Sequence, residues 1–277
     1  MIFRFLWGNT MTVFNKAILT VSALVLSTTS VSAADLFNRT ERGSLKDAPV
    51  QVERKRPECS ASVALTTDYV FRGLSQTDEG PAISGSFDCS YSMFYVGVWA
   101  SNIDFNVPGA EADIEVDLYG GVKGKVGQFE LDLGVIYYAY PSANDDILVG
   151  AGNDPEFLEV KFAVSTEISG VGLSGAVNWT DNFFGLGDES VAVEGGISFA
   201  LGNWGIISPN FSGALGHQTF DNNTAVGLDD YTYWNAGVDF TVPGYDKISI
   251  DLRYHDTDLD ENDNGDERFV ATVSSTW

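Results

Sequence analysis

The sequence predicts an all-β protein, an antiparallel up-and-down transmembrane β-barrel of about 12 strands. Three observations lead to this prediction. Apolar and polar residues alternate in short runs from Cys59 to Trp277, long and short connections take turns between these runs, and the long connections are strongly acidic. The composition agrees, because 13% aromatic residues and 29 glycines beside only 3 methionines favour strands over helices.

The alternation is clearest in residues 113–123, where apolar residues occupy one face and charged or polar residues the other. Each run approaches the ~9–11 residues that a tilted strand needs to cross a bilayer. Pro209 lies inside the ninth run and cannot donate to a ladder, so we expect a bulge or a late start there. The runs begin near Ala61, Ala82, Phe94, Asp113, Phe129, Phe157, Val171, Ser190, Ile206, Tyr231, Lys247 and Arg268.

Because a soluble β-sandwich alternates in the same way, the connections have to separate the two folds. The six long connections hold 22 Asp or Glu residues and neither Lys nor Arg. Long outer loops and tight periplasmic turns are typical of outer-membrane barrels, and an even strand number places both ends on the periplasmic side. The long connections are 75–81, 102–113, 141–157, 181–190, 217–231 and 255–267, and the short ones are 91–93, 124–127, 169–172, 202–205 and 243–246.

The last strand and several aromatic residues fit this interpretation. Phe269, Val273 and Trp277 alternate to the final residue, an ending that resembles the signal read by the bacterial barrel-assembly machinery. A strand that merely ends there is the alternative. Aromatic residues near strand ends are expected to form interfacial girdles. They are Tyr69, Phe71, Tyr137, Trp179, Tyr233, Trp234 and Tyr254.

The region before the barrel divides into two segments. Residues 1–33 have Arg4 and Lys16, an apolar run and a small-residue exit at 31–33, which predicts a secretory signal peptide with a true start possible at Met11. The apolar run is too short to serve as a membrane anchor. Residues 34–58 are polar and without period, so they are expected to form a flexible periplasmic linker, and residues 59–277 form the barrel.

The charge of the chain excludes one class of partner. The formal net charge is −24, and the chain after residue 33 contains 39 acidic and 13 basic residues. Such a chain repels nucleic acid and attracts cations. Expected partners are outer-membrane lipid, lipopolysaccharide, the barrel-assembly machinery during biogenesis, and small solutes or cations; no cofactor is expected.

Six segments resemble the TorF-like porin family, which consists of outer-membrane proteins of proteobacteria. They are 63–77 (VALTTDYVFRGLSQT), 81–83 (PAI), 94–97 (FYVG), 99–102 (WASN), 115–121 (EVDLYGG) and 134–141 (GVIYYAYP). The resemblance covers residues 59–277, most specifically the first half, and implies a porin-like barrel in the bacterial outer membrane. It supplies no catalytic residues.

The chain departs from that pattern at Cys59 and Cys89, which fall near the same predicted rim. Export places them in an oxidising compartment, and two cysteines allow only one intramolecular pairing. We therefore predict a Cys59–Cys89 disulfide. The alternative is two separate thiols.

An outward apolar face sends the charged residues of the strands into the lumen. Acidic groups in a narrow passage attract cations, so we expect a porin-like channel for passive diffusion of small solutes that favours cations. If basic residues pair with the acids, the lumen is plugged, and the barrel becomes a closed structural or surface-interaction protein. The predicted pore-lining residues are Asp68, Arg72, Asp88, Glu115, Asp117, Lys123, Glu130, Asp132, Glu159, Lys161, Glu194, Asp239, Asp251 and Arg253.

Metal-binding and enzymatic functions have less support. Residues 260–265 resemble the opening of a calcium loop, but the closing Glu would fall on Ala271, so Asp258, Asp260 and Asp263 are only weak metal candidates. Loose recruitment of divalent cations by the acidic loops is expected instead of a specific metal site. An outer-membrane lipid hydrolase is a remote alternative, because His217 and His255 lie at loop edges without an adjacent Ser, and we expect no enzyme.

Overall fold

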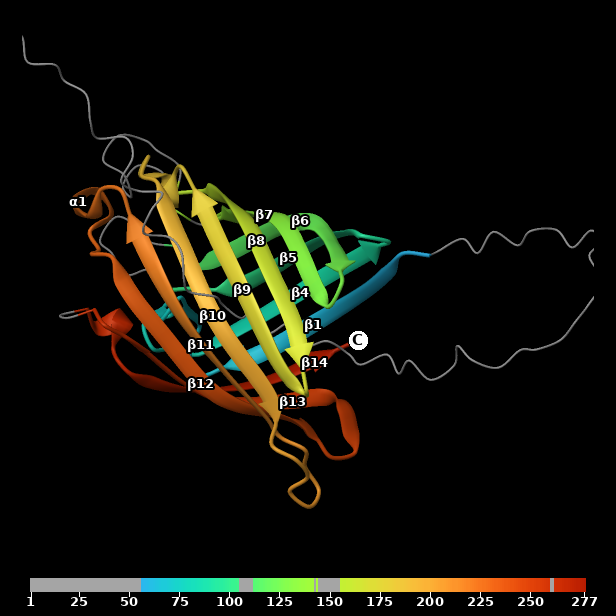
Figure 1. Ribbon diagram of the computed structural model, residues 1–277. Coiled ribbons are helices and arrows are strands. Elements are labelled where there is room, and N and C mark those ends of the chain that lie inside the picture. The colour runs from blue at the N-terminus through green and yellow to red at the C-terminus, as the bar shows by residue number, and fades with distance from the viewer. Residues whose placement is uncertain (1–55, 105–111, 142, 144–154, 260–261) are drawn as a thin grey trace, which may run out of the picture.

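The computed structural model describes residues 56–104, 112–141, 143, 155–259 and 262–277. Its twelve long strands close into one antiparallel barrel in which neighbours in sequence are neighbours in space, and β1 pairs with β14 to complete the ring (Figure 1). The predicted 12-stranded barrel is therefore confirmed. The strands are β1 (Glu58–Thr66), β4 (Ala82–Tyr91), β5 (Phe94–Asn102), β6 (Ile114–Val126), β7 (Phe129–Ala139), β8 (Phe157–Ile168), β9 (Val171–Thr180), β10 (Ser190–Ala200), β11 (Asn210–Phe220), β12 (Tyr231–Val242), β13 (Tyr245–Thr257) and β14 (Arg268–Thr276).

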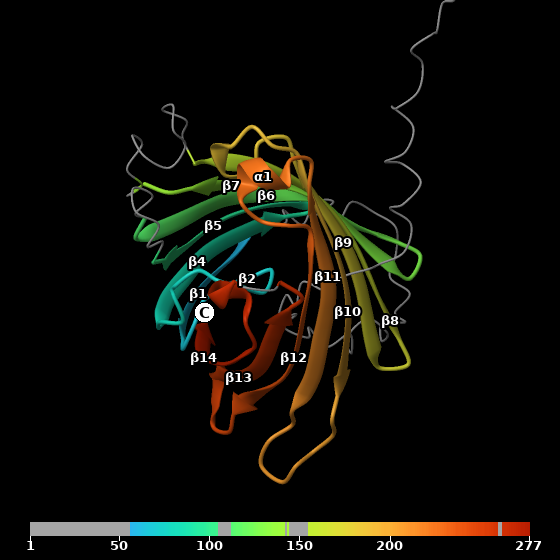
Figure 2. The same cartoon turned by 90° about the vertical axis from the view of Figure 1, so that its left-hand side faces the viewer.

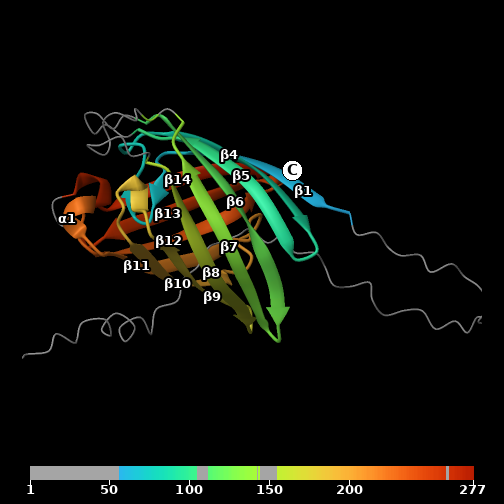
Figure 3. The same ribbon diagram turned by 90° about the horizontal axis from the view of Figure 1, so that it is seen from above.

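The first and last strands lie side by side and remove the edges that an open sheet would leave. Ser62 pairs with Thr276, and the backbone N–H of Trp277 donates to the carbonyl of Ala61 at 2.9 Å. The strands are tilted, so that the near and far walls cross in projection (Figures 1 and 3). The carboxyl end of the chain consequently lies beside the first strand.

The two rims of the barrel differ, and we name them by their connections. The turn end carries the barrel termini and the connections 92–93, 127–128, 169–170, 201–209 and 243–244. The expected short turn at 202–205 is wrong, because the ladder between β10 and β11 starts only at Ala200–Asn210, after Pro209. The predicted late start of that strand is confirmed. The loop end carries the long connections, with η1 (Phe183–Gly185), α1 (Asn223–Val226) and η2 (Asp263–Gly265).

The first long connection folds inward. β1 ends at Thr66, well before the expected connection at 75–81, and β2 (Val70–Phe71) pairs with β3 (Leu74–Ser75) as a separate hairpin. Its two-residue turn has φ 48° at Arg72 and φ 85° at Gly73, the positive values that a type I′ turn requires. Figure 2 shows this element inside the ring of strands. We call β2 and β3 the lumen hairpin.

The wall is apolar outside and polar inside. Outward positions on the strands hold exposed apolar side chains such as Leu65 (59% exposed) and Phe94 (58%). Inward positions hold buried charges such as Glu115 (2%) and Glu159 (1%). This distribution inverts that of a soluble protein, in which large apolar side chains are covered and charges face water.

Two predictions about the amino-terminal region stay predictions. The signal peptide and most of the linker, residues 1–55, lie outside the described residues. Among the residues that are described, helices are too short and too polar to cross a bilayer.

Candidate functional site: the barrel lumen

The lumen receives the charged side chains of the strands because directly paired residues share one face of the wall. Lys123 pairs with Asp132, and Asp239 pairs with Asp251, all of them opposite in phase to the exposed apolar residues. Twelve of the fourteen predicted lining residues therefore point inward from strands. The other two, Asp68 and Arg72, belong to the inserted segment after β1 and not to the strand itself.

Arg72, at the tip of the lumen hairpin, binds the far wall. Its guanidinium donates two hydrogen bonds to the Glu159 carboxylate on β8, at 2.9 and 2.7 Å, and one to Gln218 Oε1 on β11 at 3.0 Å. Glu159 also accepts a hydrogen bond from the Tyr138 hydroxyl at 3.1 Å. The Arg72 side chain is only 7% exposed. The bidentate pair therefore fixes the hairpin across the lumen.

Glycine is required beside Arg72. A Cβ at Gly73 would lie 2.5 Å from Thr257 Cγ2 and 2.8 Å from Tyr233 Cβ. The hairpin tip therefore packs directly against β12 and β13, and its positive φ also favours glycine.

The base of the hairpin is attached to the near wall. Asp68 is buried and accepts hydrogen bonds from Ser75 Oγ at 2.7 Å and Thr77 Oγ1 at 2.9 Å. Its other oxygen accepts from Arg268 on β14 at 3.0 Å. Since β14 is the neighbour of β1, this network holds the hairpin close to where it leaves the wall.

An aromatic core fills the loop end of the lumen around the hairpin. The Tyr69 hydroxyl donates to Glu115 at 2.8 Å, and the Phe71 ring meets Tyr138 edge-on at 5.9 Å between centroids. The predicted girdle positions of Tyr69, Phe71 and Tyr233 are therefore wrong, because these residues point inward. Other members of the core are Ile103, Ala112, Tyr140, Phe157, Phe183, Phe220 and Tyr231.

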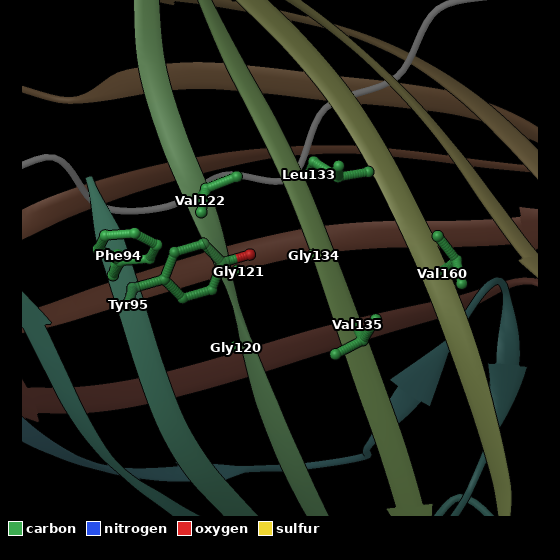
Figure 4. Close-up of a pocket in the computed structure, with 9 residues that line it drawn as sticks. All are labelled: Phe94, Tyr95, Gly120, Gly121, Val122, Leu133, Gly134, Val135 and Val160. Carbon is green, nitrogen blue, oxygen red and sulfur yellow. The ribbon is translucent and has the colours of Figure 1, made fainter.

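Toward the turn end the lumen is lined by smaller polar groups and local ion pairs. Asp132 is bound by Lys161 at 2.8 Å, approached by Lys123 at 3.8 Å, and accepts from the Tyr95 hydroxyl at 2.8 Å. Figure 4 shows the Tyr95 ring extended along the wall toward Gly121 and Gly134, beside a shallow hollow lined mainly by apolar residues of β5 to β8. A Cβ at Gly121 would lie 2.6 Å from the Tyr95 hydroxyl, so the glycine makes room for the ring.

A second lumen arginine stays close to its own strand. Arg253 on β13 pairs with Asp251 at 2.8 Å and donates to Asn235 and Ser212, each at 2.8 Å. These partners lie on β13, β12 and β11, so that Arg253 lies along the wall, whereas Arg72 spans the lumen.

The remaining predicted site residues lie outside the lumen. Cys59 and Cys89 are joined by a disulfide between directly paired positions of β1 and β4, near the turn end. On β14 and just after it, Phe269, Val273 and Trp277 are exposed at 82%, 47% and 58%.

The acidic loop and the histidines do not form a shared site in the described part of the chain. Asp258 accepts from the backbone N–H of Thr232, Asp260 lies outside the described residues, and the described residues hold no cluster suited to a metal ion. His217 is exposed and contacts Thr232 at 3.2 Å, whereas the paired position of His255 with Asn235 turns it inward. The two histidines thus occupy opposite faces of the wall.

Sequence reasoning missed several groups that complete the lumen networks. Gln218 and Ser190 bond to each other behind Arg72, Arg268 holds Asp68, and Tyr95 reaches Asp132. Arg268 and Gln218 are charged or polar residues at inward positions of the alternation, and that phase is the signal that could have selected them.

The fold and the lumen define a closed β-barrel with an apolar exterior and a charged interior. The chain belongs to the family described as bacterial protein of unknown function (Gcw_chp), whose model matches residues 54–277. No match is found among curated protein sequences.

Three solved structures are similar in fold at low sequence identity. LpxR from Salmonella typhimurium is 9% identical, with TM-score 0.46, covering 79% of this chain and 99% of that one. An outer membrane channel from Pseudomonas putida F1 is 14% identical, with TM-score 0.46, covering 86% of this chain and 99% of that one. The NanC porin is 9% identical, with TM-score 0.44, covering 79% of this chain and 98% of that one.

Proposed function

We propose that this protein is a porin-like channel of the bacterial outer membrane, used for passive diffusion of small solutes and favouring cations. One observation carries the proposal: a closed barrel presents apolar side chains outside and charged side chains inside. A lipid bilayer covers such an exterior and needs no further partner, and closure leaves no backbone edge in the hydrocarbon. On this orientation the turn end is periplasmic and the loop end faces outward.

The charge of the lumen supports the preference for cations. Glu115, Asp117 and Glu194 point into the lumen, where Glu115 accepts from the Tyr69 hydroxyl at 2.8 Å and Glu194 from the Tyr233 hydroxyl at 3.0 Å, both neutral donors. Arg72, Lys161 and Arg253 already have carboxylate partners. The surplus of carboxylates lowers the energy of a cation inside the barrel and raises that of an anion.

Single-channel recording of the mature chain, residues 34–277, in a planar bilayer with a salt gradient tests the proposal. We expect stable steps and a reversal potential of the sign for cation flow. A barrel that inserts and shows the heat-modifiable gel mobility of a folded barrel, yet never conducts in any variant, contradicts the channel.

The binding of Arg72 across the lumen favours a second candidate function, that of a closed barrel. Because Arg72 is bound across the lumen to Glu159 and Gln218, the barrel is a closed surface-interaction protein if that hairpin never moves. In that case the acidic loops at the outer end would recruit divalent cations and lipopolysaccharide. Permanent absence of conductance, with Mg²⁺-dependent binding to lipopolysaccharide vesicles, would favour this function.

We further propose that the protein is not an enzyme. The placement of His217 and His255 on opposite faces of the wall supports this proposal. Lipid hydrolysis by the wild type that is lost on changing either histidine would overturn it. Recognition of the last strand by the barrel-assembly machinery is likewise proposed from the outward row Phe269, Val273 and Trp277.

A further inference from the structure

We propose that the lumen hairpin is a displaceable plug, with Arg72 as the latch that holds its tip on the far wall. The inference rests on the proposed channel function and concerns its regulation. The closed state is the arrangement seen in the structure, with the hairpin tip on the far wall. The open state is the same barrel with the hairpin tip released.

The hairpin can leave the far wall without breaking the barrel. β2 pairs only with β3, and neither strand belongs to the ladder of the twelve-stranded ring. Its tip is fastened by side-chain bonds and packing: Arg72 bonds to Glu159 and Gln218, Phe71 packs on Tyr138, and Gly73 packs closely against Thr257 and Tyr233. Release therefore exchanges side-chain contacts and leaves every inter-strand hydrogen bond of the wall intact.

The tip and the base of the hairpin are attached to different strands of the wall. Around the ring, the strands follow the order β1, β14, β13, β12, β11, β10, β9, β8, so that β8 and β11 lie well away from β1. The hydrogen bonds of the tip go to these distant strands and Gly73 packs against β12 and β13, whereas the base is held by the Asp68–Arg268 pair to β14, next to β1. Loss of the tip contacts alone would let the hairpin swing on a base that stays in place.

Displacement also changes the charge of the lumen. Arg72 is the cation that the hairpin carries into the centre, where it neutralises Glu159. Once the tip leaves, Glu159 joins Glu115, Asp117 and Glu194 as an acidic group facing the passage. The open state should therefore be both more conductive and more cation-favouring than the closed one.

The test compares single-channel records of the wild type, Arg72→Ala and Arg253→Ala. Arg253 is the matched control, because it is also a lumen arginine paired with a carboxylate, but it belongs to the wall. We expect Arg72→Ala to raise the open probability roughly tenfold or more and Arg253→Ala to change it several-fold less; both remove a positive charge from the lumen, so both should shift the reversal potential toward cations. Equal open probability in all three proteins would overturn the plug and leave the channel standing.

Two further variants test the plug even if Arg72→Ala does not fold. Gln218→Ala removes one latch contact without stranding a charge, so it serves if Arg72→Ala does not fold, and its expected effect is smaller and of the same sign. Replacement of residues 70–75 by a Gly-Ser linker removes the plug outright. If this folded barrel also fails to conduct, the channel function and the plug both fall.

A readout of hairpin position complements the electrical one. Leu74→Cys places a thiol on the hairpin, in a chain whose two native cysteines are already joined. We expect a membrane-impermeant maleimide to label it several-fold faster in the Arg72→Ala background than in the Arg253→Ala background. Equal labelling rates would show that Arg72 does not hold the hairpin, and would overturn the latch whatever the conductance.

Discussion

Two of the lumen arginines, Arg72 and Arg253, differ in what they connect. Arg72 joins segments 87 and 146 residues apart in sequence, because the hairpin brings it to Glu159 and Gln218. Arg253 contacts groups only 2, 18 and 41 residues away, all on its own strand or the next two. Arg72 lies in the aromatic core of the loop end, whereas Arg253 lies along the wall among polar side chains of β11, β12 and β13.

The difference indicates that one barrel contains two kinds of interior. The loop end resembles the core of a soluble protein turned inside the ring, with stacked aromatic rings around a buried ion pair. Outside the aromatic core, small polar side chains and partly exposed ion pairs line the wall. Perturbations at the loop end should therefore cost more free energy and change the passage more.

Glu159→Ala should give the largest loss of stability. It removes the partner of a nearly buried guanidinium and leaves that charge uncompensated, which costs about 3–5 kcal/mol in folded proteins. Urea titration of the barrel in phospholipid vesicles, read by heat-modifiable gel mobility, measures the change. Asp251→Ala is the matched control; its pair with Arg253 is more exposed, so the loss should be about 1 kcal/mol or less. Equal losses at the two sites would contradict the distinction between the two interiors.

Loss of the Cys59–Cys89 disulfide should have the next largest effect. The crosslink encloses β1, the lumen hairpin and β4, with a separation of 30 residues, and bridges of this kind contribute about 2–4 kcal/mol. Cys59→Ser with Cys89→Ser should lower the urea midpoint in the vesicle assay. Conductance should not change, because the bridge lies on the outward face near the turn end. A changed open probability would show that the crosslink also positions the hairpin.

Gly121→Ala should cause a moderate loss of stability, through the part of the lumen nearer the turn end. The added methyl group would lie 2.5 Å from the backbone carbonyl oxygen of Leu133 on β7 and 2.6 Å from the Tyr95 hydroxyl. It would push both away and break the hydrogen bond of Tyr95 to Asp132, a loss of about 1–3 kcal/mol. Gly124→Ala on the same strand is the control, because a Cβ there meets nothing within 4 Å. Both variants are compared by urea titration. If the two lose equal stability, backbone freedom and not room for Tyr95 explains Gly121.

The barrel was predictable because period two is a local property of the sequence. Exposed Leu118 and buried Glu115 already differ in phase within one run, and the first residue of most strands follows from the same alternation. The exception at Asn210 also follows from a local cause, since Pro209 cannot donate to a ladder. Strand pairing then needs only neighbours in sequence.

The inward hairpin was not predictable from that alternation. The segment 63–77 continues to alternate after Thr66, so its pattern does not distinguish a wall strand from a hairpin inside the ring. Two features override it: the positive φ values at Arg72 and Gly73, and partners that are far away in sequence. Arg-Gly between two apolar residues is a weak turn signal, because only the glycine favours positive φ by itself.

Glu130→Gln should give the smallest effect of these substitutions, a small change in ion selectivity. Glu130 points inward on β7 near the turn end, opposite Lys125 and far from the hairpin tip. Its removal takes one negative charge from a partly exposed position, where screening by salt weakens selectivity. The reversal potential should move slightly toward anions at low salt and return to the wild-type value at high salt. Glu115→Gln, at a buried position of the loop end, should give a larger shift that persists at high salt. If Glu130→Gln gives the larger shift, then the turn end is the selective part of the lumen and the hairpin region is only its cover.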